Sequence, residues 1–163
     1  MCHSTVLPIE RKDYMIEKDR VISIQENFLW KEQFEVLRNT ITGPEFPWYF
    51  DPIKVSNNED RSITPGQFIH MVYERNAPCS QYYDSHFIPI LKQLNVAILT
   101  RIKLNLSPRL SEPFYSEFHT DIGISELHED LMVHSKTSIL YMNTNNGYTE
   151  LENGEEDTRV ESV

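Results

Sequence analysis

The sequence contains few glycines and cysteines, and both shortages argue against particular classes of protein. Its 163 residues include five glycines and two cysteines. The glycines form no glycine-rich phosphate-binding loop, and there is no G-x-S-x-G motif or convincing Cys-His pair, which argues against nucleotide and serine hydrolysis. Cys2 and Cys79 lie far apart and form no C-x-x-C motif, so we expect neither a disulfide framework nor a zinc site.

Long apolar runs and an excess of basic residues are also missing. No run approaches the roughly 20 apolar residues needed to span a bilayer, and charges near the N-terminus occupy the place of a secretory signal's apolar core. The formal net charge of −10 disfavours sequence-independent binding to nucleic acid, because phosphate affinity comes mainly from Lys and Arg. We therefore expect a soluble, cytoplasmic protein with no membrane partner and no general affinity for nucleic acid.

Two segments have the spacing of helices. Residues 26–44 carry one apolar stripe at intervals of four, three and four, formed by Trp30, Phe34, Leu37 and Ile41. Gly43 and Pro44 follow as a stop signal, with the glycine suited to a left-handed cap. Residues 79–95 show a second helical pattern, in which Ser80 is a plausible cap and Pro89 marks a kink or a restart.

Later segments have the patterns of strands. Residues 46–52, "FPWYFDP", favour an extended strand, and residues 101–107 alternate strictly between apolar and polar side chains. Residues 136–147 predict a further strand, and residues 148–163 predict a hairpin that turns at Asn153 and Gly154. Helices followed by strands predict an α+β domain with a mostly antiparallel sheet. We expect one such domain over residues 21–163, preceded by a flexible, polar segment over residues 1–20.

The most promising chemical motif is the H-x-D pair His119 and Asp121 in "YSEFHTDIG". On a strand, residues i and i+2 lie on one face about 7 Å apart, so both side chains could reach one metal ion. An imidazole and a carboxylate are two of the three ligands in the facial triad that binds non-haem Fe(II). His128 and His134 are weaker candidates for a further ligand. A surface or hydrogen-bonded histidine is the default interpretation of His3, His70 and His86.

Polar residues on the 101–107 strand allow two interpretations. Arg101, Lys103, Asn105 and Ser107 share one face, which either lies in solvent on an edge strand or looks into a cavity that binds an anion. A buried row of cations needs carboxylates or a bound ligand to offset its desolvation. Tyr141, within "SILYMN", is more typical of a core aromatic residue than of a ligand contact.

The ordered segments "RIKLNLSPR", "FHTDIG" and "KTSILYMNTNNGYTELENG" together resemble the Fe(II)- and 2-oxoglutarate-dependent dioxygenases. The resemblance is to the prolyl-hydroxylase-like branch and to small phage and bacterial relatives, and it extends from about Val21 onward. It implies a double-stranded β-helix, a cupin-like jelly roll with helices packed on one face. His119 and Asp121 match the first two iron ligands, and Asn105 and Tyr141 match positions that contact 2-oxoglutarate.

The reaction that this resemblance implies is a hydroxylation. The enzyme would decarboxylate 2-oxoglutarate with O₂ to succinate and CO₂, and hydroxylate a C–H bond of a second, unidentified substrate, with proteins among the candidates. Three open positions on the iron would serve the chelating oxo acid and O₂. The main alternative is a non-catalytic jelly-roll module used for binding or assembly.

The family pattern continues beyond what this sequence contains. The resemblance implies a distal histidine and a basic residue on later strands, and neither follows "NGEEDTRVESV". We therefore expect the domain to be C-terminally incomplete, with its last strands missing. The sequence could be a fragment of a longer product, a shortened protein that completes its sheet with a partner or a second copy through the exposed edge, or a non-catalytic relative.

Overall fold

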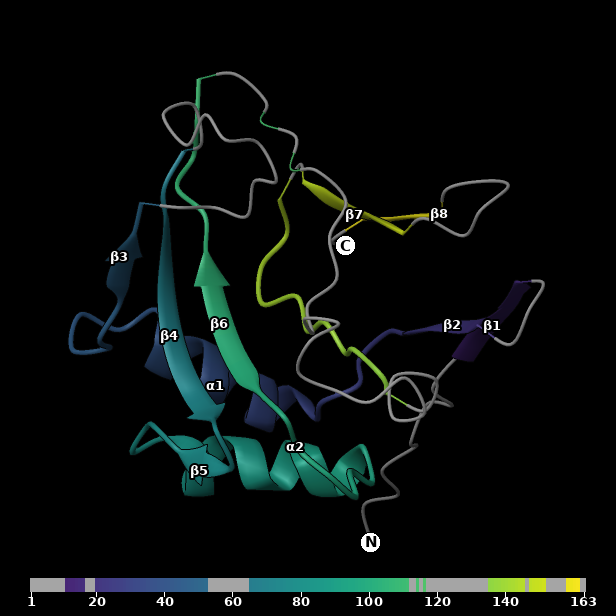
Figure 1. Ribbon diagram of the computed structural model, residues 1–163, viewed down its shortest axis with the longest axis horizontal. Helices are drawn as coiled ribbons and strands as arrows, with labels where there is room; N and C mark the ends of the chain where they lie inside the picture. Colours follow the sequence, from purple (N-terminus) through teal and green to yellow (C-terminus); the bar gives the residue numbers. More distant parts are fainter. Residues whose placement is uncertain are drawn as a thin grey trace, which may run out of the picture. The chain divides into compact units, whose positions relative to one another are not determined.

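The chain combines helices with antiparallel strands in two compact units. The computed structural model describes residues 11–16, 20–52, 65–111, 114, 116, 135–145, 147–151 and 158–161 (Figure 1). One unit comprises Met1–Gly43 with Thr144–Val163, and the other comprises Pro44–Asn143. Mixed helix and antiparallel sheet agree with the α+β expectation, whereas the double-stranded β-helix stays a prediction. None of the helices in these ranges has the length and apolar character required to cross a membrane.

The first unit contains two antiparallel hairpins and a helix. Its elements are β1 (Arg11–Ile16), β2 (Arg20–Gln25), α1 (Lys31–Ile41), β7 (Tyr148–Leu151) and β8 (Thr158–Glu161). β1 pairs with β2 from Arg11↔Gln25 to Ile16↔Arg20. β7 pairs with β8 from Tyr148↔Glu161 to Leu151↔Thr158, which confirms the two antiparallel strands expected after residue 148, while the turn predicted at Asn153 and Gly154 lies outside the described residues. The strand β1 was not expected, because residues 1–20 have no clear apolar alternation and were predicted to be flexible.

α1 follows the apolar stripe of the sequence but is shorter than the pattern. Leu37 and Ile41 are buried and Phe34 is half-buried, whereas Trp30 is the N-cap residue and is 65% exposed. At the other end, Thr42 donates its hydroxyl to the Arg38 carbonyl at 2.8 Å. Gly43 does not take the left-handed conformation expected of it, so the helix ends without a glycine cap of that type.

The second unit is built around an antiparallel sheet in the order β3-β4-β5, with β6 also paired to β4. Its strands are β3 (Tyr49–Asp51), β4 (Gln67–Glu74), β5 (Ala77–Pro78) and β6 (Ile102–Leu106). Figure 1 shows β4 and β6 running side by side. β3 and β6 confirm two predicted strands. β4 was missed, because apolar residues occupy both of its faces and conceal the two-residue period.

A bulge in β4 changes the direction of its last side chains. Met71 lies opposite Lys103 and Tyr73 lies opposite Ile102, so Val72 is an extra residue in the ladder. In a regular strand Tyr73 would share a face with Met71. The shift pairs it with Ile102 instead, on the opposite face. Val72 is 0% exposed, so the bulge is fixed inside the core.

A tight turn and a two-part helix follow β4. Arg75 and Asn76 join β4 to β5 with φ values of 52° and 60°, as a two-residue hairpin of type I′ requires. η2 (Tyr83–Phe87) is a π-helical turn that leads directly into α2 (Ile88–Gln93). Pro89 lies in the first turn of α2 and cannot donate the backbone bond of a continuous α-helix. The predicted restart at this proline is therefore confirmed.

Candidate functional site

The predicted iron ligands His119 and Asp121 lie outside the described residues, as do the weaker candidates His128 and His134. Their assignment stays a prediction from the sequence. Among the residues that the structure describes, there is no group of three or more His, Cys, Asp and Glu side chains that could hold a metal ion. The described part of the chain thus neither adds a third ligand nor tests the first two.

Asn105, the first predicted 2-oxoglutarate contact, lies on β6 opposite Ile69 of β4, and its side chain is exposed. Lys103 lies two residues earlier on the same face, opposite Met71, and is half-buried. Neither the Asn105 amide nor the Lys103 ammonium has a hydrogen-bond or ion-pair partner in the structure as described. β6 therefore presents two unpaired nitrogen donors beside apolar residues of β4.

Tyr141, the second predicted 2-oxoglutarate contact, is half-buried. It does not lie on a strand, because residues 135–145 have no strand or helix, and the strand predicted over residues 136–147 is therefore wrong within the described part of that range. The turn predicted to close it does form locally, since the Gly147 backbone N–H donates to the Asn145 side-chain oxygen at 2.6 Å. Apolar alternation in "SILYMN" fits a strand, but alternation alone supplies no partner strand.

His70 of β4 forms a buried network of hydrogen bonds. The side chain is 5% exposed. Nδ1 lies 2.8 Å from the Pro47 carbonyl oxygen and Nε2 lies 2.8 Å from Ser80 Oγ. Because a carbonyl oxygen only accepts, Nδ1 carries the proton, and Nε2 of the neutral ring accepts from the Ser80 hydroxyl. Ser80 Oγ also accepts from the Tyr82 backbone N–H at 3.2 Å.

Aromatic rings surround this imidazole. Ring centroids of Phe46, Tyr82 and Tyr49 lie 4.5, 6.1 and 6.4 Å from that of His70. A Ser–His bond of 2.8 Å has the geometry of a nucleophile and its base. However, the imidazole is closed to solvent, and its other partner is a neutral carbonyl instead of a carboxylate that would stabilise a positive ring. We therefore assign His70 to the structure of the core, which agrees with the default interpretation of this histidine.

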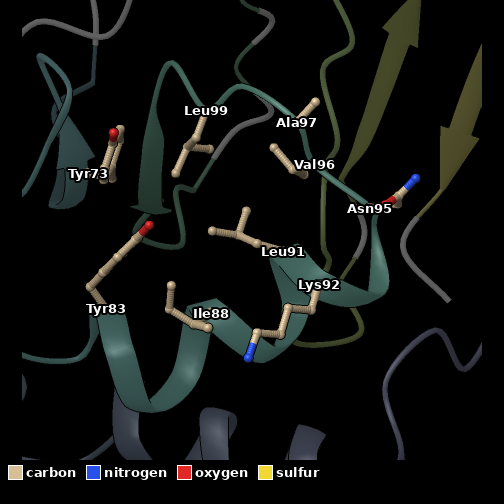
Figure 2. A pocket seen from close by; sticks show the side chains of 9 residues that line it. All are labelled: Tyr73, Tyr83, Ile88, Leu91, Lys92, Asn95, Val96, Ala97 and Leu99. Carbon is tan, nitrogen blue, oxygen red and sulfur yellow. The ribbon is translucent and has the colours of Figure 1, made fainter.

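A cavity of about 500 Å³ lies beside α2, in the Pro44–Asn143 unit. Figure 2 shows its lining side chains, which come from β4, from η2 and α2, and from the segment that follows α2. They are Tyr73, Tyr83, Ile88, Leu91, Lys92, Asn95, Val96, Ala97 and Leu99. No motif marks these residues in the sequence. Tyr73 and Tyr83 had no predicted role.

The chain thus offers three groups of candidate residues. They are the H-x-D pair, the unpaired donors of β6 and the cavity beside α2. The last two rest on described geometry, and the first rests on the sequence. No family model, curated protein or solved structure matches this chain.

Proposed function

We propose that this chain is an Fe(II)- and 2-oxoglutarate-dependent dioxygenase domain that hydroxylates a second substrate, with proteins among the candidates. The observation that carries the proposal is the H-x-D pair His119 and Asp121, placed between "RIKLNLSPR" and "KTSILYMNTNNGYTELENG" in the order typical of that family. Strand β6, formed by the first of these segments, supports the proposal because its polar face carries unpaired donors.

The two predicted ligands are of the types that bind Fe(II), but a complete facial triad needs three. One imidazole and one carboxylate match two positions of the facial triad, and no described residue group supplies the third. When bound, the iron would supply the site for O₂ activation and for chelation of the oxo acid. His119 and Asp121 would hold the metal, and each would need its lone pair free, so the imidazole would be neutral and the carboxylate ionised.

Lys103 and Asn105 are suited to bind the anionic cosubstrate. Lys103 is half-buried and has no carboxylate partner among the described residues, so its ammonium is available to pair with an anion. The Asn105 amide, two residues along the same face, can donate to the same carboxylate. Asn105 is proposed as a 2-oxoglutarate contact because of the family resemblance, and Lys103 is proposed because of its position on β6. Tyr141 is retained as a proposed contact through its hydroxyl.

Anaerobic titration of the full chain with Fe(II), with and without 2-oxoglutarate, tests this proposal. We expect weak binding, because two ligands do not complete the triad, and a loss of affinity of about tenfold or more when either His119→Ala or Asp121→Ala removes a ligand. His86→Ala is the matched control, since this histidine lies on η2. Unchanged iron binding by the doubly substituted chain would contradict the proposed ligands.

A second titration tests the cosubstrate site separately. Lys103→Met keeps the apolar stem and removes the charge, and it should weaken binding of 2-oxoglutarate to the iron-loaded chain about fivefold or more. The control Lys31→Met removes a lysine from α1, where it lies 3.9 Å from Glu35. Equal affinities for the two variants would exclude Lys103 from the site.

A further inference from the structure

We propose that the cavity beside α2 is a second binding site, which takes a small aromatic monocarboxylate. Its volume of about 500 Å³ falls within the range of small-molecule sites, roughly 300–1,000 Å³. All the described residues of this site belong to the Pro44–Asn143 unit, and the site requires neither iron nor 2-oxoglutarate.

The end of α2 forms one wall of the cavity. Asn95 takes a φ of 52°, its backbone N–H donates to the Lys92 carbonyl at 3.1 Å, and the Val96 N–H donates to the Leu91 carbonyl at 3.1 Å. These two bonds are the Schellman motif, which reverses the chain at the end of a helix and brings the second residue beyond it against the last turn. Val96 and Leu91 accordingly both line the cavity.

Two tyrosines form the opposite wall. The bulge at Val72 pairs Tyr73 with Ile102, and the Tyr73 ring stacks on Tyr83 of η2 at a centroid distance of 5.3 Å and an angle of 27°. In Figure 2 both rings lie on one side of the cavity, across from Leu91 and Leu99. An aromatic ring in the cavity can therefore contact a tyrosine face on one side and aliphatic carbon on the other.

The polar groups of the cavity favour an anion. Among the described residues that line it, Lys92 is the one charged residue, and none is Asp or Glu. The ammonium has no ion-pair or hydrogen-bond partner in the described chain, and the Tyr73 and Tyr83 hydroxyls have no hydrogen bond there either. Figure 2 shows the Lys92 stem alongside Ile88 with its nitrogen at the edge of the lining. One cation at the rim of a cavity lined mainly by aliphatic and aromatic side chains suits one carboxylate with an apolar body.

A carboxylate is favoured over a phosphate group. A phosphate dianion is usually held by arginine forks or several backbone N–H groups, whereas the described side chains of this lining offer one ammonium, two hydroxyls and the Asn95 amide. The aliphatic and aromatic side chains then account for the remainder of the ligand. These features identify the ligand class as a single carboxylate joined to an aromatic ring.

Calorimetric or NMR titration of the full chain with 3-phenylpropionate tests the proposal, with 3-phenylpropionamide as the neutral control. For 11 non-hydrogen atoms at typical ligand efficiency we expect a Kd of about 1 mM for the acid. The amide should bind about fivefold more weakly, as expected for loss of one exposed charge pair. Equal affinities for acid and amide, or no binding of the acid at about ten times the expected Kd, would overturn the proposal.

Variants assign the binding to this cavity. Lys92→Met should weaken binding of the acid about fivefold and leave the affinity for the amide unchanged. Lys31→Met on α1 should change neither affinity. Ala97→Phe, which fills the cavity from the segment after α2, should abolish binding of both compounds in a chain that keeps its NMR dispersion. An unaffected acid affinity in both Lys92→Met and Ala97→Phe would place the binding elsewhere. 2-Oxoglutarate, which has no aromatic ring, should not compete.

Discussion

Two regions along β4 differ in whether their polar groups have hydrogen-bond partners. His70 is enclosed by aromatic rings, and both of its nitrogens are hydrogen-bonded. Three residues later, Tyr73 borders an open cavity in which the lysine and the tyrosine hydroxyls have no partner among the described residues. A fully satisfied buried group contributes mainly to stability, whereas unpaired groups around a cavity are available to a ligand. The contrast predicts which substitutions affect folding and which affect binding.

The largest effect on stability is expected at His70. His70→Ala removes a buried ring and leaves the Ser80 hydroxyl and the Pro47 carbonyl without their partner, so we expect a loss of about 3 kcal/mol and a fall in Tm of about 10 °C. Thermal and urea unfolding measure this change. The control His86→Ala, on a half-buried ring, should cost less than about 1 kcal/mol. Equal losses for both histidines would remove the distinction between the two regions.

A smaller loss is expected at the other end of the same hydrogen bond. Ser80→Ala deprives His70 Nε2 of its donor inside the core and should destabilise the chain by about 1–2 kcal/mol. Ser85→Ala removes a serine whose hydrogen bonds are exposed, and should cost less than about 0.5 kcal/mol. The difference between the two urea-unfolding free energies is the measurement, and no difference would show that the buried bond contributes little.

On the cavity side, Asn95 should tolerate glycine better than alanine. Its φ of 52° costs an alanine about 1 kcal/mol, whereas glycine adopts this conformation without a steric penalty. Unfolding free energies of Asn95→Ala and Asn95→Gly give the comparison. The alanine variant should also bind 3-phenylpropionate less well, because the reversal after α2 positions Val96 and Ala97. An alanine variant as stable as the glycine variant would argue against the Schellman motif at this helix end.

The smallest effect on stability is expected at Lys92. Its exposed ammonium has no partner in the described chain, so Lys92→Met should change the unfolding free energy by less than about 0.5 kcal/mol. The same variant should nevertheless lose carboxylate affinity. Measured together, the two quantities separate a binding residue from a structural one. A loss of stability comparable to that of Ser80→Ala would make Lys92 part of the fold.

The sequence predicted elements whose two faces differ. The α1 stripe and the alternation of β6 are visible in the sequence as periods of apolar residues. β4 was not predicted, because both of its faces carry apolar residues. Tyr141 was wrongly predicted to lie on a strand, because an alternating pattern does not show whether a partner strand exists. The H-x-D pair was identified from sequence alone and lies outside the described residues.

By itself, the sequence determined the mixture of helices and strands, the acidic character and the types of side chain that could bind a metal ion. Only the tertiary structure decided which polar groups are satisfied and which are available. His70 lies on β4, whereas Pro47 precedes β3 and Ser80 follows β5. The three residues meet because β4 pairs with both of those strands. Tyr73, Tyr83 and Lys92 surround one cavity because a bulge and a helix-ending turn orient their segments. Such features depend on where segments meet in space, which a one-dimensional period does not encode.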